Sequence, residues 1–320
     1  MIFASTTDGG SNMRSAGLDV AGDDTIYCFL HLLHLVVTDV FERYANRIET
    51  LRSYVKAIRT SANKSSLLRE HSPKHLKLIL DNPTRWNGTY LMIKRYLKLL
   101  PTLDQLHSQY EIFGDLDRPS GSKHWYGSLK QLLKPFYEIT ILAQKKSVAT
   151  LQFVPRWIDH IQMSLARLST SAEETVILRE MADYANQRCS ARFNMFTSSA
   201  NLSLCAAALT PYTCGLQFTF MNDSLKKAVW NKMERDAIEL LTDDASETST
   251  ASSNQISGPA LYSSESSDES AETIQAICVR KALANLRKHW SNNHQTYIMK
   301  MNMPIQFDGG QQIHSLNRAR

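Results

Sequence analysis

Residues 81–90 read DNPTRWNGTY, and this stretch decides how the chain around it folds. Pro83 disfavours helical geometry at Asn82 and, because it lacks an N–H, suits the first turn of a helix. Downstream, apolar side chains recur at helical spacing and basic ones take the other face. The apolar set is Leu91, Met92, Tyr96, Leu97 and Leu100, and the basic set is Lys94, Arg95 and Lys98. The pattern predicts a loop that enters a basic amphipathic helix near residues 84–86.

Two interpretations of Arg85 and Trp86 stay open. Tryptophan is buried on average, so Trp86 can fill the core beneath the helix start while Arg85 is solvated. Alternatively, both side chains contact nucleic acid, because basic side chains beside an aromatic ring suit a phosphate backbone and an unstacked base. A basic run leads into the motif, with Glu70 as its one acidic residue: Lys56, Arg59, Lys64, Arg69, Lys74 and Lys77.

Charge is distributed unevenly over the 320 residues, whose net charge is +5. Residues 242–273 contain seven acidic side chains and no Lys or Arg, which leaves 36 basic against 24 acidic side chains, or +12, elsewhere. A body this basic is compatible with a polyanionic partner such as DNA. The acidic stretch also holds ten Ser and four Thr. Because it has too few apolar groups to offset the entropy of ordering, we predict a disordered linker there.

Other features bound the class of protein. No apolar run is long enough for a membrane span, and the first residues do not read as a secretory signal. The five cysteines are odd in number and widely spread, which favours reduced thiols over a disulfide framework. We therefore expect an intracellular, soluble protein without a membrane partner.

Three motifs carry a resemblance to a known family. The stretch 81–90 resembles the PTRWNSTY signature of hAT-superfamily transposases, whose relatives include proteins with a BED zinc finger ahead of a transposase-like body. Residues 6–13, TTDGGSNM, are similar to the segment that holds the family's second catalytic aspartate. Residues 28–37, CFLHLLHLVV, are similar to its Cys-x2-His helix. The motifs occur in the family's order and at plausible spacing.

The resemblance implies roles for individual residues. Asp8 stands at the position of a metal-binding aspartate and would be a vestigial catalytic residue and a weak metal ligand; from the residues alone it can equally cap a helix. Trp86 would be the ring that contacts a base. Cys28 and His31 would pack near the old active site. Residues that we expect to bind DNA are Arg85, Trp86, Lys94, Arg95 and Lys98.

A zinc site offers another interpretation of Cys28 and His31. Together with His71 and His75 they make a Cys-x2-His…His-x3-His pattern. The gap between the two pairs is longer than in small zinc modules, and Pro73 separates the last two ligands, so we prefer the packing role.

The expected fold is mostly α with a small α/β remnant, namely a partial RNase H-like core interrupted by an all-helical insertion domain. We place the partial core at residues 1–100, the helical insertion domain at 101–241, the linker at 242–273, and a C-terminal helix and tail at 274–320. Pro101, Pro119, Pro135, Pro155 and Pro211 read as punctuation between helices.

The sequence also departs from the family. We find no counterpart of the BED finger, the first catalytic aspartate, the catalytic glutamate or the C-terminal dimerisation segment. Since one carboxylate cannot run a two-metal reaction, we expect no enzyme activity and no cofactor in this fragment, whereas an intact relative would use Mg²⁺ or Mn²⁺. The leading interpretation is a nuclear fragment or domesticated derivative of a transposase with residual, weak DNA binding, whose partners include a second copy or a transposase-like protein. The alternatives are a host-recruited transcription-regulatory protein and a helical scaffold without a nucleic-acid role.

Overall fold

A computed structural model describes residues 5–7, 25–82, 85–119, 121–144, 150–171, 175–210, 213, 215–250 and 279–285. The chain forms two compact units. The first comprises residues 1–207 and 217–229, and the second comprises 208–216 and 230–320. The candidate functional residues lie in the first unit.

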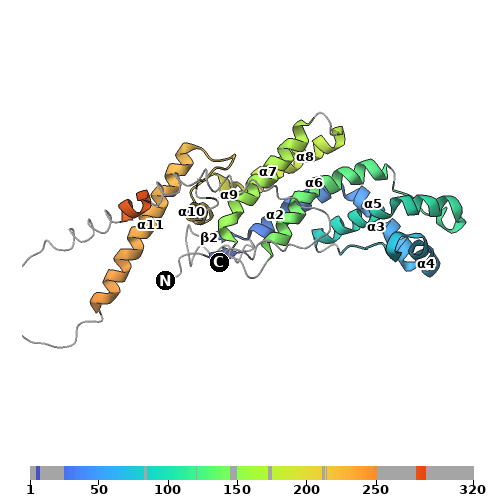
Figure 1. The fold of residues 1–320 in the computed structure, drawn as a ribbon, viewed down its shortest axis with the longest axis horizontal. Coiled ribbons are helices and arrows are strands. Elements are labelled where there is room, and N and C mark those ends of the chain that lie inside the picture. Colours follow the sequence, from blue (N-terminus) through green and yellow to red (C-terminus); the bar gives the residue numbers. More distant parts are fainter. Residues whose placement is uncertain are drawn as a thin grey trace, which may run out of the picture. The chain divides into compact units, whose positions relative to one another are not determined.

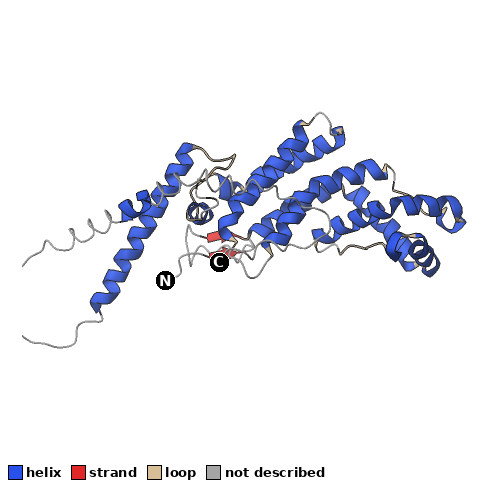
Figure 2. Ribbon diagram, viewed as in Figure 1, coloured by secondary structure: helices blue, strands red, loops and turns tan. Residues whose placement is uncertain are grey.

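The described residues are mostly helical, as the sequence predicted (Figures 1 and 2). The longer helices of the first unit are α2 (Phe29–Arg43), α3 (Ala45–Thr60), α4 (Ala62–His71), α5 (Trp86–Gln109), α6 (Ser122–Ala143), α7 (Val154–Thr170) and α8 (Val176–Arg192). The shorter ones are η2 (Pro73–His75), η3 (Glu111–Phe113), η4 (Leu151–Phe153), α9 (Asn194–Thr197) and α10 (Leu202–Ala208). Helix α11 (Asp223–Thr250) follows, and residues 279–285 are helical.

A short sheet precedes the helices. Strands β1 (Ser5–Thr7) and β2 (Thr25–Tyr27) pair in parallel, with Thr6 opposite Ile26. Helix α2 begins directly after β2, and Tyr44 separates α2 from α3. Strand β1 lies within residues 1–13, where we expected a strand and a turn, but most of that range lies outside the described residues.

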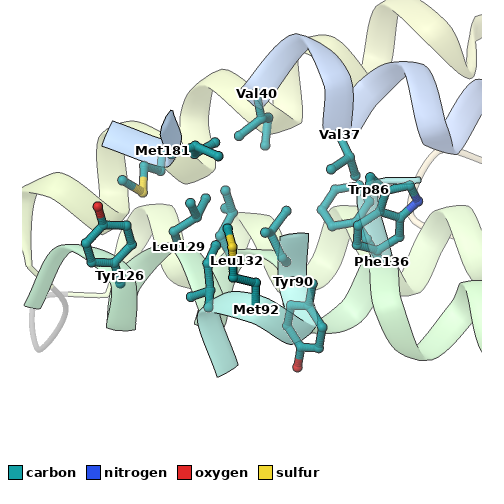
Figure 3. Close-up of a cluster of buried hydrophobic side chains, with 14 of the residues drawn as sticks. Val37, Val40, Trp86, Tyr90, Met92, Tyr126, Leu129, Leu132, Phe136 and Met181 are labelled. Carbon is teal, nitrogen blue, oxygen red and sulfur yellow. The ribbon is translucent and has the colours of Figure 1, made fainter. Parts of the chain in front are cut away.

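Helix α2 lies at the centre of the core, because it packs against α8, α6, α5 and α3. Its side chains Leu33, Val36 and Val37 are fully buried. The facing helix α6 contributes Leu129, Leu132, Leu133 and Phe136. Figure 3 shows Val37 and Val40 pointing toward this cluster.

Two predicted boundaries fall within helices. The domain boundary between residues 100 and 101 falls inside α5, which continues through Pro101. A proline in a helix removes one hydrogen bond, but Leu99, Leu103 and Leu106 on either side are fully buried and their burial favours the continued helix. Helix α6 likewise contains Pro135. Helix α11 continues to Thr250 and so enters the range 242–273 that we predicted as a linker; residues 251–273 lie outside the described ones.

In the part of the chain that the structure describes, no helix has the length and apolar character to cross a membrane.

Candidate nucleic-acid interface

The connection between α4 and α5 passes along two helices that carry arginines. Arg59 on α3 donates from Nη1 to the carbonyl oxygen of Leu78 (3.1 Å), and Arg95 on α5 donates from Nη1 to the carbonyl oxygen of Lys77 (2.7 Å). Residues 76–82, which we call the connecting segment, are thereby held between α3 and α5. Its backbone carbonyls orient both guanidinium groups.

The far end of the connecting segment is fixed by one carboxylate. Arg52 donates to Asp81 from Nε (2.9 Å) and from Nη2 (2.8 Å), and Thr89 donates its hydroxyl to the same side chain (2.7 Å). Burial alone would raise the pKa of Asp81, but the hydrogen bonds from Arg52 and Thr89 outweigh it and hold that pKa below its usual value. We call these three residues the Asp81 clamp. It ties α3, the connecting segment and α5 together.

The first turn of α5 lies close to the connecting segment. A Cβ atom on Gly88 would lie 3.1 Å from the backbone nitrogen of Asn82, so a larger residue would push the two apart. The amide of Arg85 donates to the carbonyl oxygen of Asn82 (3.0 Å). Glycine at this position of the motif is therefore explained by packing.

Trp86 is part of the core. Only 6% of its surface is exposed, and its ring meets that of Tyr137 edge to face with centroids 6.5 Å apart. Figure 3 places the indole beside Phe136 and below Val37. Arg85, the residue before it, is exposed. Of the two interpretations of Trp86, the structure agrees with the core residue. The role of contacting a base would require an exposed ring, and the ring of Trp86 is buried.

Exposed cations gather around the connecting segment. Two come from α3, one from the segment and two from α5, and together they are Lys56, Arg59, Lys77, Arg95 and Lys98. Lys77 and Lys98 are exposed, and Arg95 is half-buried beside its carbonyl partner. Within the described residues, none of the five forms an ion pair with a carboxylate. We call this set the basic ridge.

Lys94 does not share this position. Burial raises the pKa of Glu138 on α6, and the positive charges of Lys134 and Lys94 oppose that rise. Lys94 therefore lies near a carboxylate, whereas Arg95 points to the connecting segment. Of the predicted DNA-binding residues, Arg95 contacts Lys77, Lys98 is exposed one helical turn further along α5, Arg85 is exposed at the start of α5, and Trp86 is buried.

The zinc hypothesis is wrong for the described residues, where no three His, Cys, Asp or Glu side chains come together as metal ligands. His71 pairs through Nδ1 with the carbonyl oxygen of Leu67 (3.0 Å), and His75 pairs through Nδ1 with that of Arg69 (3.1 Å). Cys28 and His31 belong to the start of α2, where the amide of His31 donates to the carbonyl oxygen of Cys28 (3.0 Å). Asp8 lies outside the described residues.

Sequence reasoning missed Arg52 and Thr89. Thr89 belongs to the 81–90 motif, but the sequence of the motif does not reveal whether its hydroxyl binds Asp81 or water. Arg52 stands 29 residues before Asp81, and no spacing rule pairs them.

Comparisons with known proteins agree with the motifs. Residues 26–128, which contain the basic ridge and the Asp81 clamp, match the family model described as the ZBED1 RNase-like helical domain. The chain is 25% identical over 167 residues to a maize (Zea mays) protein named as an AC transposase, covering 47% of this chain and 21% of that protein. It is 23% identical over 191 residues to the Zinc finger BED domain-containing protein RICESLEEPER 2 of Oryza sativa subsp. japonica. This match covers 58% of this chain and 25% of that protein. The chain thus spans about a quarter or less of these relatives and is a partial, hAT-transposase-like relative of them.

The Asp81 clamp gives a first prediction. Asp81→Ala should lower the free energy of unfolding by about 3 kcal/mol, because it removes a buried carboxylate, leaves Thr89 without its acceptor and leaves Arg52 paired with the exposed Glu49 alone. The control is Asp104→Ala, whose partner Arg118 and whose own side chain are about half exposed, and it should cost less than about 1 kcal/mol. Urea unfolding measures both, and equal losses would contradict the clamp.

The same clamp sets a pH dependence. Since the pKa of Asp81 is lowered in the folded state, its stabilisation is present above the ordinary carboxyl pKa of about 3.9 and is lost as the pH falls through the lowered value. The gap in stability between the parent and Asp81→Ala should therefore narrow below about pH 4.

Neighbouring residues test the burial of Trp86. Trp86→Ala should lower the free energy of unfolding by about 3–5 kcal/mol, as is usual when a core indole is removed. Arg85→Ala, one position earlier and exposed, should change it by less than about 0.5 kcal/mol. If Trp86→Ala were as mild as its neighbour in urea unfolding, the indole would not be a core residue.

Proposed function

We propose that this chain is transposase-derived and binds DNA through the basic ridge, in the nucleus. The observation that carries the proposal is a set of five cations on α3, the connecting segment and α5, without ion pairs among the described residues: Arg59 and Arg95 contact the segment that bears Lys77, and Lys56 and Lys98 lie about one helical turn from these arginines. Residues 56–98 as a whole hold ten basic and two acidic side chains, and one of the acids, Asp81, is already paired with Arg52. The transposase and BED-finger relatives support the same reading.

The geometry suits phosphate groups. Arg59 and Arg95 each use Nη1 on a backbone carbonyl, which leaves the Nε and Nη2 edge of each guanidinium to donate outward. Lysines contribute point charges that need no fixed geometry. A cation that neutralises a phosphate releases a condensed counterion, so the binding should weaken steeply with salt.

The proposal also concerns the origin of the fold. We infer that the parallel pair β1–β2 and α2 are the remnant of an RNase H-like core, as the motifs implied. The described residues do not supply the carboxylate set that a two-metal nuclease requires, and the chain contributes Asp8 alone at a family position. We therefore propose binding without cleavage for this chain.

Two other functions remain in competition. A transcription-regulatory protein recruited by the host would use the same ridge, and it differs only in its further partners, which include a second copy or a transposase-like protein. A helical scaffold without a nucleic-acid role would leave the ridge solvated. DNA affinity separates the scaffold from the other two.

The binding test is a fluorescence anisotropy titration with labelled duplex DNA of mixed sequence. The parent should bind, and its log Kd should rise with log salt with a slope of about 3–4, because up to five phosphates are neutralised at about 0.9 each. Lys56→Ala/Lys77→Ala/Lys98→Ala should lower that slope by about two to three units and weaken binding on every sequence alike.

The side chains of these three lysines form no hydrogen bond or ion pair among the described residues, and an alanine keeps the backbone carbonyl of Lys77 that accepts from Arg95, so the triple variant should keep its stability. The matched control is Lys227→Ala, an exposed lysine on α11 outside the ridge, which should bind as the parent does. If the triple variant kept the parent's affinity and salt slope, the basic ridge would not bind DNA, and the helical scaffold without a nucleic-acid role would be the favoured function.

Cleavage is tested separately. We expect the chain to leave plasmid and oligonucleotide DNA intact in Mg²⁺ and in Mn²⁺ over hours. Nicking that depends on Mn²⁺ and disappears in Asp8→Ala would overturn the proposal that this chain is not a nuclease.

A further inference from the structure

Proteins that hold single-stranded DNA without sequence preference combine cations with exposed aromatic rings on which the bases stack. The rings near the basic ridge can be examined one by one. Residues 45–100 contain four aromatic side chains, Tyr54, Trp86, Tyr90 and Tyr96. Their exposed fractions are 4%, 6%, 4% and 1%. All four are core residues, so none of them presents a face to a base.

Contacts within the core hold these rings in place. Tyr54 lies edge to face with Tyr96 at 6.0 Å between centroids, and its hydroxyl pairs with Nε2 of His107 at 2.8 Å. Tyr90 stacks on Tyr137 at 4.5 Å, and Trp86 meets the same ring. Bringing any of the four to the surface would break an aromatic pair and expose apolar area, which is unfavourable.

Residues 45–100 therefore offer charge and hydrogen-bond donors but no exposed tyrosine or tryptophan ring. The two guanidinium groups of the ridge are tied by Nη1 to the carbonyls of Leu78 and Lys77, which fixes their orientation. Such a surface gains chiefly from phosphates. Duplex DNA presents one negative charge per about 1.7 Å of its axis and releases more counterions per contact than a single strand does.

From this we infer that the basic ridge is a reader of the duplex DNA backbone: it binds double-stranded DNA more tightly than single-stranded DNA, and it does so without contacting bases. The inference rests on the proposed DNA binding and narrows it to one class of substrate. It also reverses the role that the motif implied for Trp86, which would favour an opened or single-stranded end.

Three probes of equal length and label test the inference: a duplex, an oligothymidylate, and a single strand of abasic residues with the same number of phosphates. The parent protein is titrated with each at one low salt concentration. We expect the duplex to bind at least about fivefold more tightly than oligothymidylate, and the two single strands to bind within about twofold of each other. Stacking would instead make oligothymidylate bind at least about tenfold more tightly than the abasic strand, because each stacked base contributes strongly to affinity.

The outcomes separate the two levels of the argument. The inference is supported if the duplex binds most tightly and the two single strands bind with equal affinity. The triple lysine variant should then bind all three probes more weakly than the parent, and Lys227→Ala should bind each of them as the parent does. Tighter binding of oligothymidylate than of either other probe overturns the inference and leaves DNA binding standing. No binding of any probe overturns the proposed function, and the inference falls with it. A Trp86→Phe variant, which keeps a ring in the core, should match the parent on all three probes.

Discussion

The carboxylate of Asp81 is the constraint on which the first unit's surface depends. A buried carboxylate is costly unless hydrogen bonds and an opposite charge compensate for lost hydration. Arg52 and Thr89 provide both, from helices on either side of the connecting segment. Because the three donor atoms come from two helices, their arrangement is satisfied only when α3, the segment and α5 are in register.

That register places the cations. With Asp81 fixed at one end of the segment, the carbonyls of Lys77 and Leu78 lie where Arg95 and Arg59 can reach them. If the segment were displaced, these guanidiniums would lose their acceptors, and the side chain of Lys77 would move away from α5. The charge of the ridge is a property of composition, but its concentration at one surface is a property of the fold.

Sequence reasoning succeeded where the signal is local. The stripe of α2 was visible because helical periodicity places Leu33, Val37 and Val40 on one face, and burial follows. It failed at Pro101, because the local penalty of a proline was visible while the burial of Leu99 and Leu103 around it was not. The fate of Trp86 stayed open, since an indole at a helix start is compatible with the core and with a ligand. The pair of Arg52 and Asp81 was beyond reach, because 29 residues separate them and only the fold brings them together.

The motif at 81–90 can now be read position by position without DNA. Asp81 and Thr89 form the clamp with Arg52, Gly88 admits the backbone of Asn82, and Trp86 and Tyr90 fill the core around Tyr137, while Asn82 and Arg85 are exposed. Packing therefore accounts for most of the residues that carry the family resemblance. A sequence that keeps this motif shows that it keeps the fold around α5, and the same motif in a relative is no evidence that its tryptophan touches a base. The proposed DNA binding therefore rests on residues outside the 81–90 motif, namely the cations of the basic ridge, of which Arg59 and Arg95 contact the segment that the clamp fixes.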